Sequence, residues 1–186
     1  EGIAVLRGVE ANFAADGSLL LNEAILRKLD IVLAGFHPNL EPSDDIATNT
    51  EIVMNALKSG LVDIWSHPGN PKYPVDYEAV LACAKENKVA VEINSSSSVN
   101  TRYGSHDNCV KIAKLAKKIG NIISLGTDSH IAFFLGNFEE TIKIMKEAGL
   151  DDTNVINTSA MRVLDFLEER GHTPIVEMRE FFSMSS

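Results

Sequence analysis

The sequence predicts an α/β protein with a parallel sheet that forms part of a barrel. Short apolar runs rich in β-branched residues alternate with segments of helical spacing, which is the pattern of repeated βα units. A polar residue, usually of a type that binds metals, follows each run at the carboxyl end of the expected strand. The length of 186 residues and the hydrophobic fraction of 45% fit one folded domain that spans the chain.

Five apolar runs are expected to be strands. They are short and almost continuously apolar, as strands buried on both faces of a sheet are. In chain order they are Ile3–Val9, Ile31–Phe36, Val62–Ser66, Val89–Ile93 and Ile122–Leu125.

Helices are expected between and after these strands because the segments carry end signals. Thr48–Glu51 is a capping-box pattern for a helix that Gly60 ends, and Asn137–Glu140 repeats the pattern before a stop at Gly149. The other expected helices run from a cap at Asp76 to about Asn87, from the loop at Tyr103–His106 to about Gly120, and from about Ser159 to Arg170.

Composition and charge exclude several classes of protein. Seventeen basic and 26 acidic residues give a formal net charge of −9, which argues against a nucleic-acid partner. The sequence has no apolar run near the ~18 residues of a membrane helix, and no signal peptide is visible. Cys83 and Cys109 lie among apolar neighbours in expected helices, as reduced thiols of a cytoplasmic protein do. A small phosphorylated substrate stays compatible with the acidic balance, because a bound metal reverses the local field.

Polar residues recur in phase with the βα repeat. They lie roughly 30 residues apart, the length of one βα unit, and are Glu10, His37, His67, Asn94 and Asp128. In a closed barrel the carboxyl ends of the strands meet on one face, whereas an open sheet spreads them along an edge. One such histidine alone is more often a hydrogen-bonded loop residue than a ligand. Three histidines, counting His130, and two acids favour a shared metal site in a barrel.

The ligand types indicate the metal and the chemistry. Asp128 and His130 are two residues apart, so in an extended chain their side chains share one face and serve one metal or two neighbouring metals. His67 begins a loop, Pro68–Pro71, whose prolines restrict the backbone. Imidazole and carboxylate without thiolate fit zinc, manganese or iron. Several such ions close together suit hydrolysis at phosphorus.

Five sequence blocks resemble one enzyme family. The blocks are Gly8–Asn12, Ala34–His37, Ser66–Pro71, Glu92–Asn94 and Gly126–His130. They are similar to blocks of the PHP (polymerase and histidinol phosphatase) phosphoesterases, most of all to the YcdX-like bacterial phosphatases, and the resemblance reaches about Val176. It implies a distorted seven-stranded (βα) barrel, of which residues 1–186 supply the last five βα units and a C-terminal helix. It also implies a trinuclear, usually zinc, centre and phosphomonoester hydrolysis by a metal-activated water.

The resemblance assigns a role to each expected ligand. Glu10 corresponds to the carboxylate that bridges two metals, and His37 and His67 correspond to ligands of one of those ions. Asp128 matches a ligand of the other bridged ion. His130 matches a ligand of the third ion.

The sequence departs from the family at its start. The family opens with a His-x-His pair and adds two more histidines on its first two strands, but this chain contains no His-x-His. We therefore expect an N-terminally truncated domain that lacks the first two strands, and that either keeps or lacks activity of its own. Such a barrel cannot close, so the first and last strands of an open five-stranded sheet are expected to be exposed edges that contact other chains or further copies.

Candidate substrate groups follow the fourth expected strand. Arg102 can bind a phosphate through its guanidinium, although a solvated loop residue is an equal alternative. Asn94 and Ser95 can form hydrogen bonds with a substrate. His106 and His172 fall outside the βα repeat and are expected to have surface roles.

The leading hypothesis is a metal-dependent phosphoesterase that acts on a small phosphorylated substrate. Two alternatives stay open at this point. An amidohydrolase-type metal hydrolase also carries histidine and aspartate at its strand ends. A non-catalytic metal-binding or regulatory module would keep the fold without the chemistry.

Overall fold

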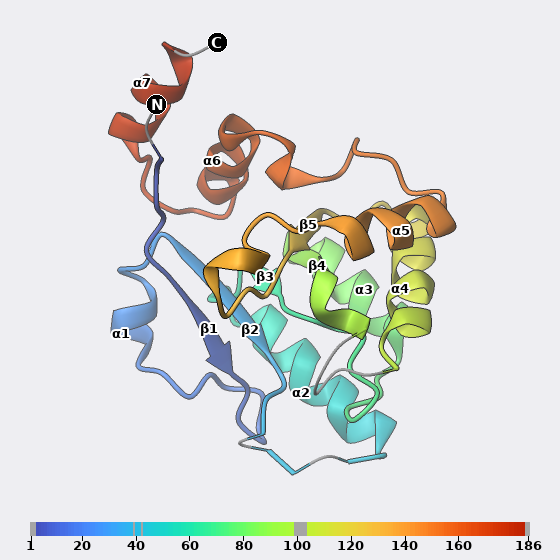
Figure 1. Ribbon diagram of the computed structural model, residues 1–186. Coiled ribbons are helices and arrows are strands. Elements are labelled where there is room, and N and C mark those ends of the chain that lie inside the picture. Colours follow the sequence, from blue (N-terminus) through green and yellow to red (C-terminus); the bar gives the residue numbers. More distant parts are fainter. Residues whose placement is uncertain (1–2, 39, 42, 99–103, 185–186) are drawn as a thin grey trace.

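A five-stranded parallel sheet forms the centre of the molecule. The computed structural model describes residues 3–38, 40–41, 43–98 and 104–184. Within them the strands lie side by side in chain order, so each βα unit adds one strand next to the previous one (Figure 1). The strands are β1 (Gly8–Asn12), β2 (Ile31–Gly35), β3 (Ile64–Trp65), β4 (Ala90–Asn94) and β5 (Ile123–Gly126). The predicted α/β class with a parallel sheet is confirmed.

The first strand begins and ends later in the chain than predicted. Gly8 pairs with Ile31, the first residue of β2, so the preceding residues have no neighbouring strand in the described part of the chain. Ile3 and Val5 are accordingly 90% and 72% exposed. The predicted strand at Ile3–Val9 is wrong in its bounds, because an apolar pattern forms a strand only beside a partner.

Seven α-helices lie within the described residues. They are α1 (Glu23–Leu26), α2 (Ile46–Lys58), α3 (Tyr77–Glu86), α4 (His106–Ile119), α5 (Glu139–Ala148), α6 (Ala160–Glu169) and α7 (Val176–Ser183). The predicted end signals at Asp76, Gly120, Gly149 and Ser159 are confirmed. The predicted start of α2 is wrong, because Asp45 accepts the amide hydrogen bonds of Ala47 and Thr48 and so caps the helix before Thr48.

The sheet has a different apolar layer on each face. One face packs against α2, α3, α4 and α5 and forms the larger core, with Trp65, Val91 and Ile123 on the sheet side. On the other face, Phe166 and Leu167 of α6 belong to a smaller cluster over the strand starts. The second face is therefore covered by helix only near the amino ends of the strands.

The face toward α6 changes from apolar to polar along the strands. Glu10 pairs with Leu33 and Leu33 pairs with Ile64, so these three side chains point to the same face. On β4, Ala90 pairs with Ile64, so Glu92, two residues further along the strand, points to the same face. Ser124 of β5 pairs with Glu92 and shares that face. Buried polar side chains thus gather at the carboxyl ends of the strands.

The edge of the sheet at β5 is covered. Ile123 forms a parallel bridge with Val155. The side-chain amide of Asn157 donates to the Leu125 carbonyl at 2.7 Å, and its oxygen accepts the Leu125 amide at 2.9 Å. Asn157 therefore bonds to β5 as a neighbouring strand would. The expectation that β5 is an open edge is wrong.

The edge at β1 differs from the edge at β5. The Arg7 carbonyl and the Phe13 amide form hydrogen bonds with β2 and the residue before it. Because successive residues of a strand direct their backbone groups to alternate sides, those of Gly8 and Glu10 point away from β2. At the end of the strand the Asn12 carbonyl accepts from the Leu20 amide. In the described residues no strand pairs with this side of β1, as expected.

Two histidines outside the predicted site connect structural elements. His172 lies 2.9 Å from both carboxylate oxygens of Asp63, which is 2% exposed and also accepts from Arg170 at 3.3 Å. His106 lies 2.7 Å from Glu140 and 3.2 Å from Glu147, and so joins α4 to α5. The expected surface role is wrong for His172, whose side chain is only 20% exposed.

None of the helices in the described residues is both long and apolar enough to cross a membrane.

Candidate functional site

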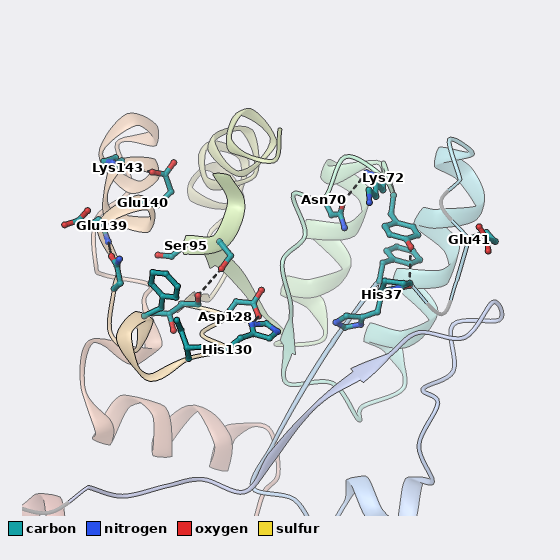
Figure 2. Close-up of a pocket in the computed structure, with 18 residues that line it drawn as sticks. His37, Glu41, Asn70, Lys72, Ser95, Asp128, His130, Glu139, Glu140 and Lys143 are labelled. Carbon is teal, nitrogen blue, oxygen red and sulfur yellow. Dashed lines mark hydrogen bonds and ion pairs between the residues drawn. The ribbon is translucent and has the colours of Figure 1, made fainter. Parts of the chain in front are cut away.

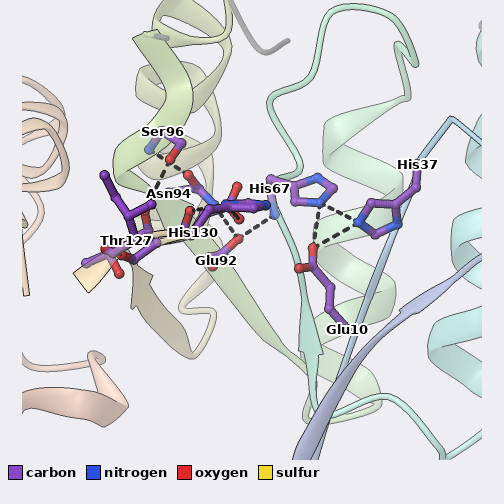
Figure 3. Close-up of polar contacts among 11 residues, drawn as sticks. Glu10, His37, His67, Glu92, Asn94, Ser96, Thr127 and His130 are labelled. Carbon is purple, nitrogen blue, oxygen red and sulfur yellow. Dashed lines mark hydrogen bonds and ion pairs between the residues drawn. The ribbon is translucent and has the colours of Figure 1, made fainter. Parts of the chain in front are cut away.

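Three of the predicted ligands converge: Glu10 lies in the middle of β1, and His37 and His67 follow the carboxyl ends of β2 and β3. Glu10 Oε1 lies 3.1 Å from His37 Nε2 and 2.7 Å from His67 Nε2. The two Nε2 atoms lie 3.2 Å apart, and the rings meet edge to face (Figure 3). Glu10, His37 and His67 form the one group of metal-binding geometry among the described residues. We refer to these three residues as the Glu-His-His cluster.

The Glu10 carboxylate is stabilised in its charged form. Burial by itself would raise its pKa, but the hydrogen bonds and the attraction of His37 and His67 lower the pKa by more, to well below the ordinary range. The carboxylate therefore stays ionised at neutral pH and supplies a negative charge to the cluster.

His37 is positioned by a tyrosine beneath its loop. The Tyr73 hydroxyl lies 2.7 Å from the Leu40 carbonyl and 3.2 Å from the His37 carbonyl, and these two acceptors share its single hydrogen. The Tyr73 ring stacks on Phe36 with 4.6 Å between centroids. His37 Nδ1 is buried without a hydrogen-bond partner in the described part of the chain, so the polar contacts of this ring are those of Nε2 in the cluster.

His67 is held in a strained conformation by a buried carboxylate. Its φ of 34° lies in the left-handed region, which costs a residue with a side chain about 1–3 kcal/mol. The His67 amide donates to Glu92 Oε2 at 2.6 Å, and the same oxygen accepts from the Asn94 side chain at 3.1 Å. Glu92 is 5% exposed. The short hydrogen bond to this buried carboxyl therefore helps to hold His67 in its strained conformation.

Two glycines leave room for these side chains. A Cβ on Gly126 would lie 1.8 Å from Glu92 Oε1, and a Cβ on Gly35 would lie 2.5 Å from Ser66 Oγ and 3.0 Å from the His67 ring. Any larger residue at Gly126 would displace the Glu92 carboxylate, and one at Gly35 would crowd the His67 ring.

The Glu-His-His cluster fits a divalent ion of the predicted kind. It presents two imidazole nitrogens and one carboxylate oxygen with no thiolate, which are donors for zinc, manganese or iron. Donor atoms of a tetrahedral zinc site lie about 3.3 Å apart for bonds of ordinary length. The separations of 2.7 to 3.2 Å in this protein are close to that value.

Asp128 and His130 lie beside this cluster but do not join it. The φ of Asp128 is 48°, so the backbone turns here and does not continue the strand. His130 Nδ1 donates to the Asp128 carbonyl at 2.9 Å, and the His130 side chain is 86% exposed. The two residues face His37 across a cavity (Figure 2).

Of the three residues expected to contact the substrate, only one is found among the described residues of the cavity wall. Asn94 is 1% exposed and uses its side chain to bind Glu92 and the Ser96 amide, so its place is behind the cavity wall. Ser95 lines the cavity and its hydroxyl lies 2.5 Å from that of Thr141. Arg102 lies outside the described residues.

The cavity next to the cluster has a volume of about 890 Å³. His37 belongs both to its wall and to the cluster. Residues that sequence reasoning did not find complete the wall, among them Lys72, Tyr73, Phe134, Glu140 and Lys143. Most come from loops and from α5, and no strand-end pattern marks them. Glu92 did carry a signal, because it is a carboxylate inside an otherwise apolar run.

Comparison with known proteins shows the family to which the chain belongs. The chain is 46% identical over 184 residues to a probable phosphatase of Shewanella sp. (strain ANA-3), which covers 98% of this chain and 73% of the relative. It is 48% identical over 172 residues to a probable phosphatase of Thermoanaerobacter sp. (strain X514), covering 91% and 70% of the two chains. The probable phosphatase YcdX of Escherichia coli O81 (strain ED1a) is 42% identical over 181 residues, covering 97% and 74%. The chain belongs to this family of probable phosphatases. No family model matches the chain.

The alignments span almost the whole chain, and so include the residues of the Glu-His-His cluster.

Proposed function

We propose that this chain is a metal-dependent phosphoesterase of the PHP family that hydrolyses phosphomonoesters. The observation that carries the proposal is the convergence of Glu10, His37 and His67, whose ligand atoms all lie within 4.8 Å of one another. The names of the YcdX-family relatives support the reaction class. Residues 1–186 would form one domain, a partial (βα)7 barrel without its first two strands, and the five parallel strands in chain order support this reading.

Zinc is the ion that we propose for the cluster, with manganese or iron as alternatives. Glu10 would bridge two ions, and His37 and His67 would hold one of them. Asp128 and His130 would hold further ions, up to three ions in an intact site. A bound divalent ion would lower the pKa of a water molecule and polarise the phosphoryl group.

The protein's own residues would bind and orient the ester. The cavity beside His37 would receive it, with Lys72 and Ser95 on its wall as groups that can contact phosphoryl oxygens. Arg102 is proposed for the same role from the sequence. Asn94 would act from behind the wall, since it orients the Glu92 carboxylate that holds the His67 amide.

The proposed partner is a small phosphorylated molecule and not nucleic acid. The net charge of −9 supports the second part of this statement. A cytoplasmic location and contacts through the β1 edge, including self-association, stay predictions. Cys83 and Cys109 are both buried free thiols, which supports a reducing compartment.

The proposal is tested by metal binding and hydrolysis in the same preparation. The purified chain is loaded with Zn²⁺, the bound metal is counted by elemental analysis, and hydrolysis of p-nitrophenyl phosphate is followed. We expect tight zinc binding and hydrolysis that a chelator abolishes. Glu10→Gln and His67→Ala should lose both, whereas the control Glu51→Gln on the exposed surface of α2 should keep both.

The other outcomes separate the alternatives. Zinc binding that depends on Glu10 and His67 without hydrolysis would favour the regulatory module. Hydrolysis of an amide or cyclic amide in place of the phosphate ester would favour the amidohydrolase type. Absence of specific zinc binding would refute the proposal.

A further inference from the structure

An exposed apolar turn stands at the rim of the cavity, directly after the loop of Asp128 and His130. Its members Ile131, Phe133, Phe134 and Leu135 are 53%, 92%, 54% and 70% exposed. The turn is a regular local structure, because the Phe134 amide donates to the Ile131 carbonyl at 3.1 Å and Phe134 in turn accepts from Asn137. We refer to Ile131–Leu135 as the apolar turn.

Two residues of the apolar turn line the cavity, and the others do not. Ile131 and Phe134 belong to its wall, as do Phe36, His37 and Tyr73. His37 is the one member of the Glu-His-His cluster on this wall, and Figure 2 shows it across the cavity from Asp128 and His130, which directly precede the apolar turn. A ligand whose phosphoryl group lies at His37 would therefore extend into a cavity that Phe134 also lines.

The cavity is larger than a phosphate group requires. Its volume of about 890 Å³ lies in the range of sites that enclose an organic molecule, roughly 300–1,000 Å³. An exposed aromatic ring in such a wall gains contact area when a planar apolar group covers it. The organic part of the ligand is thus expected to be apolar on at least one side.

The charges in the cavity disfavour a second phosphoryl group on the ligand. Carboxylates outnumber lysines on its wall, with Glu41, Asp128, Glu139 and Glu140 against Lys72 and Lys143. Glu140 is partly neutralised by Lys143 at 3.5 Å and by His106 at 2.7 Å, but Glu41 and Glu139 have no lysine within salt-bridge distance in the described residues. A second phosphate on the ligand would meet net negative charge away from the cluster, whereas an uncharged group would not.

We propose that Phe134, with Ile131, binds the aromatic group of an aryl or aryl-alkyl phosphomonoester whose phosphoryl group is held at the Glu-His-His cluster. The inference rests on the proposed function and names its substrate class. Phe134 is a specificity-determining residue in this reading, since it contacts the alcohol part of the substrate and leaves the phosphoryl part to the cluster.

The test measures binding of two phosphonates to the zinc-loaded chain by calorimetry. Methylphosphonate reports the cluster alone, and benzylphosphonate adds the aromatic group. We expect benzylphosphonate to bind about 10-fold more tightly than methylphosphonate, and Phe134→Ala to reduce that advantage about 5-fold. Methylphosphonate affinity should not change in the variant. Phe133→Ala is the matched control, because Phe133 lies in the same turn, is 92% exposed and is not part of the cavity wall.

The outcomes distinguish this inference from the proposed function. Equal binding of the two phosphonates by the unmodified chain, or an equal loss in both phenylalanine variants, would overturn the role of Phe134 and leave the phosphoesterase proposal standing. Binding of neither phosphonate would contradict the proposed function and this inference together. Circular dichroism of both variants confirms that the fold is intact before the comparison is made.

Discussion

The carboxylate of Glu92 accepts the backbone amide of His67 at 2.6 Å, across two neighbouring strands. The carboxylate is buried, and His67 is the least exposed member of the Glu-His-His cluster, with a side chain that is 3% exposed. Because the amide belongs to a residue of positive φ, the hydrogen bond fixes the backbone from which the imidazole projects. Glu92 thus positions the proposed metal ligand His67 through its backbone amide, without contacting its imidazole ring.

Replacement of Glu92 by glutamine should weaken zinc binding about 10–100-fold, as the loss of a supporting partner of a metal ligand does. Glutamine keeps an oxygen for the His67 amide but removes the charge that strengthens the hydrogen bond. The zinc affinity is measured by competition with a chromophoric chelator. Glu86→Gln, on the exposed side of α3, serves as the control. An unchanged affinity in Glu92→Gln would show that His67 does not depend on this carboxylate.

Replacement of Gly126 by alanine should destabilise the fold by about 1–3 kcal/mol, because the new Cβ would lie 1.8 Å from Glu92 Oε1. All three of the nearest atoms to that Cβ belong to the Glu92 side chain. The same change should therefore cost less in a Glu92→Ala background. Urea unfolding of the two single variants and the double variant gives the coupling, which we expect to be about 0.5–3 kcal/mol. Strictly additive effects would mean that the clash is not with Glu92.

Replacement of Tyr73 by phenylalanine should loosen the His37 loop while the stack on Phe36 remains. The one hydrogen that the His37 and Leu40 carbonyls share is lost, at a cost of about 0.5–1.5 kcal/mol. We expect a small drop in thermal stability and a several-fold weaker zinc affinity. Tyr77→Phe, at the start of α3 and away from the cluster, is the matched control. Equal effects of the two changes on zinc affinity would rule out a positioning role for Tyr73.

The pH dependence of stability should contain a contribution from His172. Its hydrogen bond to Asp63 raises the pKa above the ordinary value of 6.5 by more than burial lowers it. The charged form is therefore favoured in the folded state, and its stabilisation is fully present below about pH 6.5 and is lost as the pH rises through the raised pKa.

This contribution is measured by urea unfolding of the unmodified chain and of His172→Gln between about pH 6 and pH 9. We expect the largest difference in unfolding free energy at the acid end and convergence at the alkaline end. A difference that grows with pH would contradict the assigned direction of the shift.

Local signals in the sequence predicted the helix ends well. Asp76 and Ser159 cap their helices and Gly149 ends α5, because a cap depends on residues within one turn. The predicted start of α2 at Thr48 is wrong because Asp45, three residues before Thr48, also has a capping side chain. Asp45 accepts the capping hydrogen bonds. The bounds of β1 depend on where β2 begins, which no local pattern contains.

The candidate site was predictable only where it follows the βα repeat. His37 and His67 follow the ends of adjacent parallel strands, and Glu10 lies on the neighbouring strand β1, so the sheet brings the three side chains together. The turn at Asp128 depends on a positive φ that an aspartate seldom adopts, so the separation of Asp128 and His130 from the cluster was not visible. Phe134 and Lys143 reach the cavity through the packing of a loop and of α5, which spacing along the chain does not encode.

The side chain of Asn157 has a consequence for how copies of the molecule can meet. Its amide forms the two hydrogen bonds to the Leu125 backbone that a strand of another chain would otherwise form at the β5 edge. Another strand could therefore add to the described sheet only at the β1 edge. Two copies joined there would be related by a two-fold axis and would present only Asn157-blocked ends to the outside. Association of this sheet would then stop at a pair, and open-ended fibres would be disfavoured.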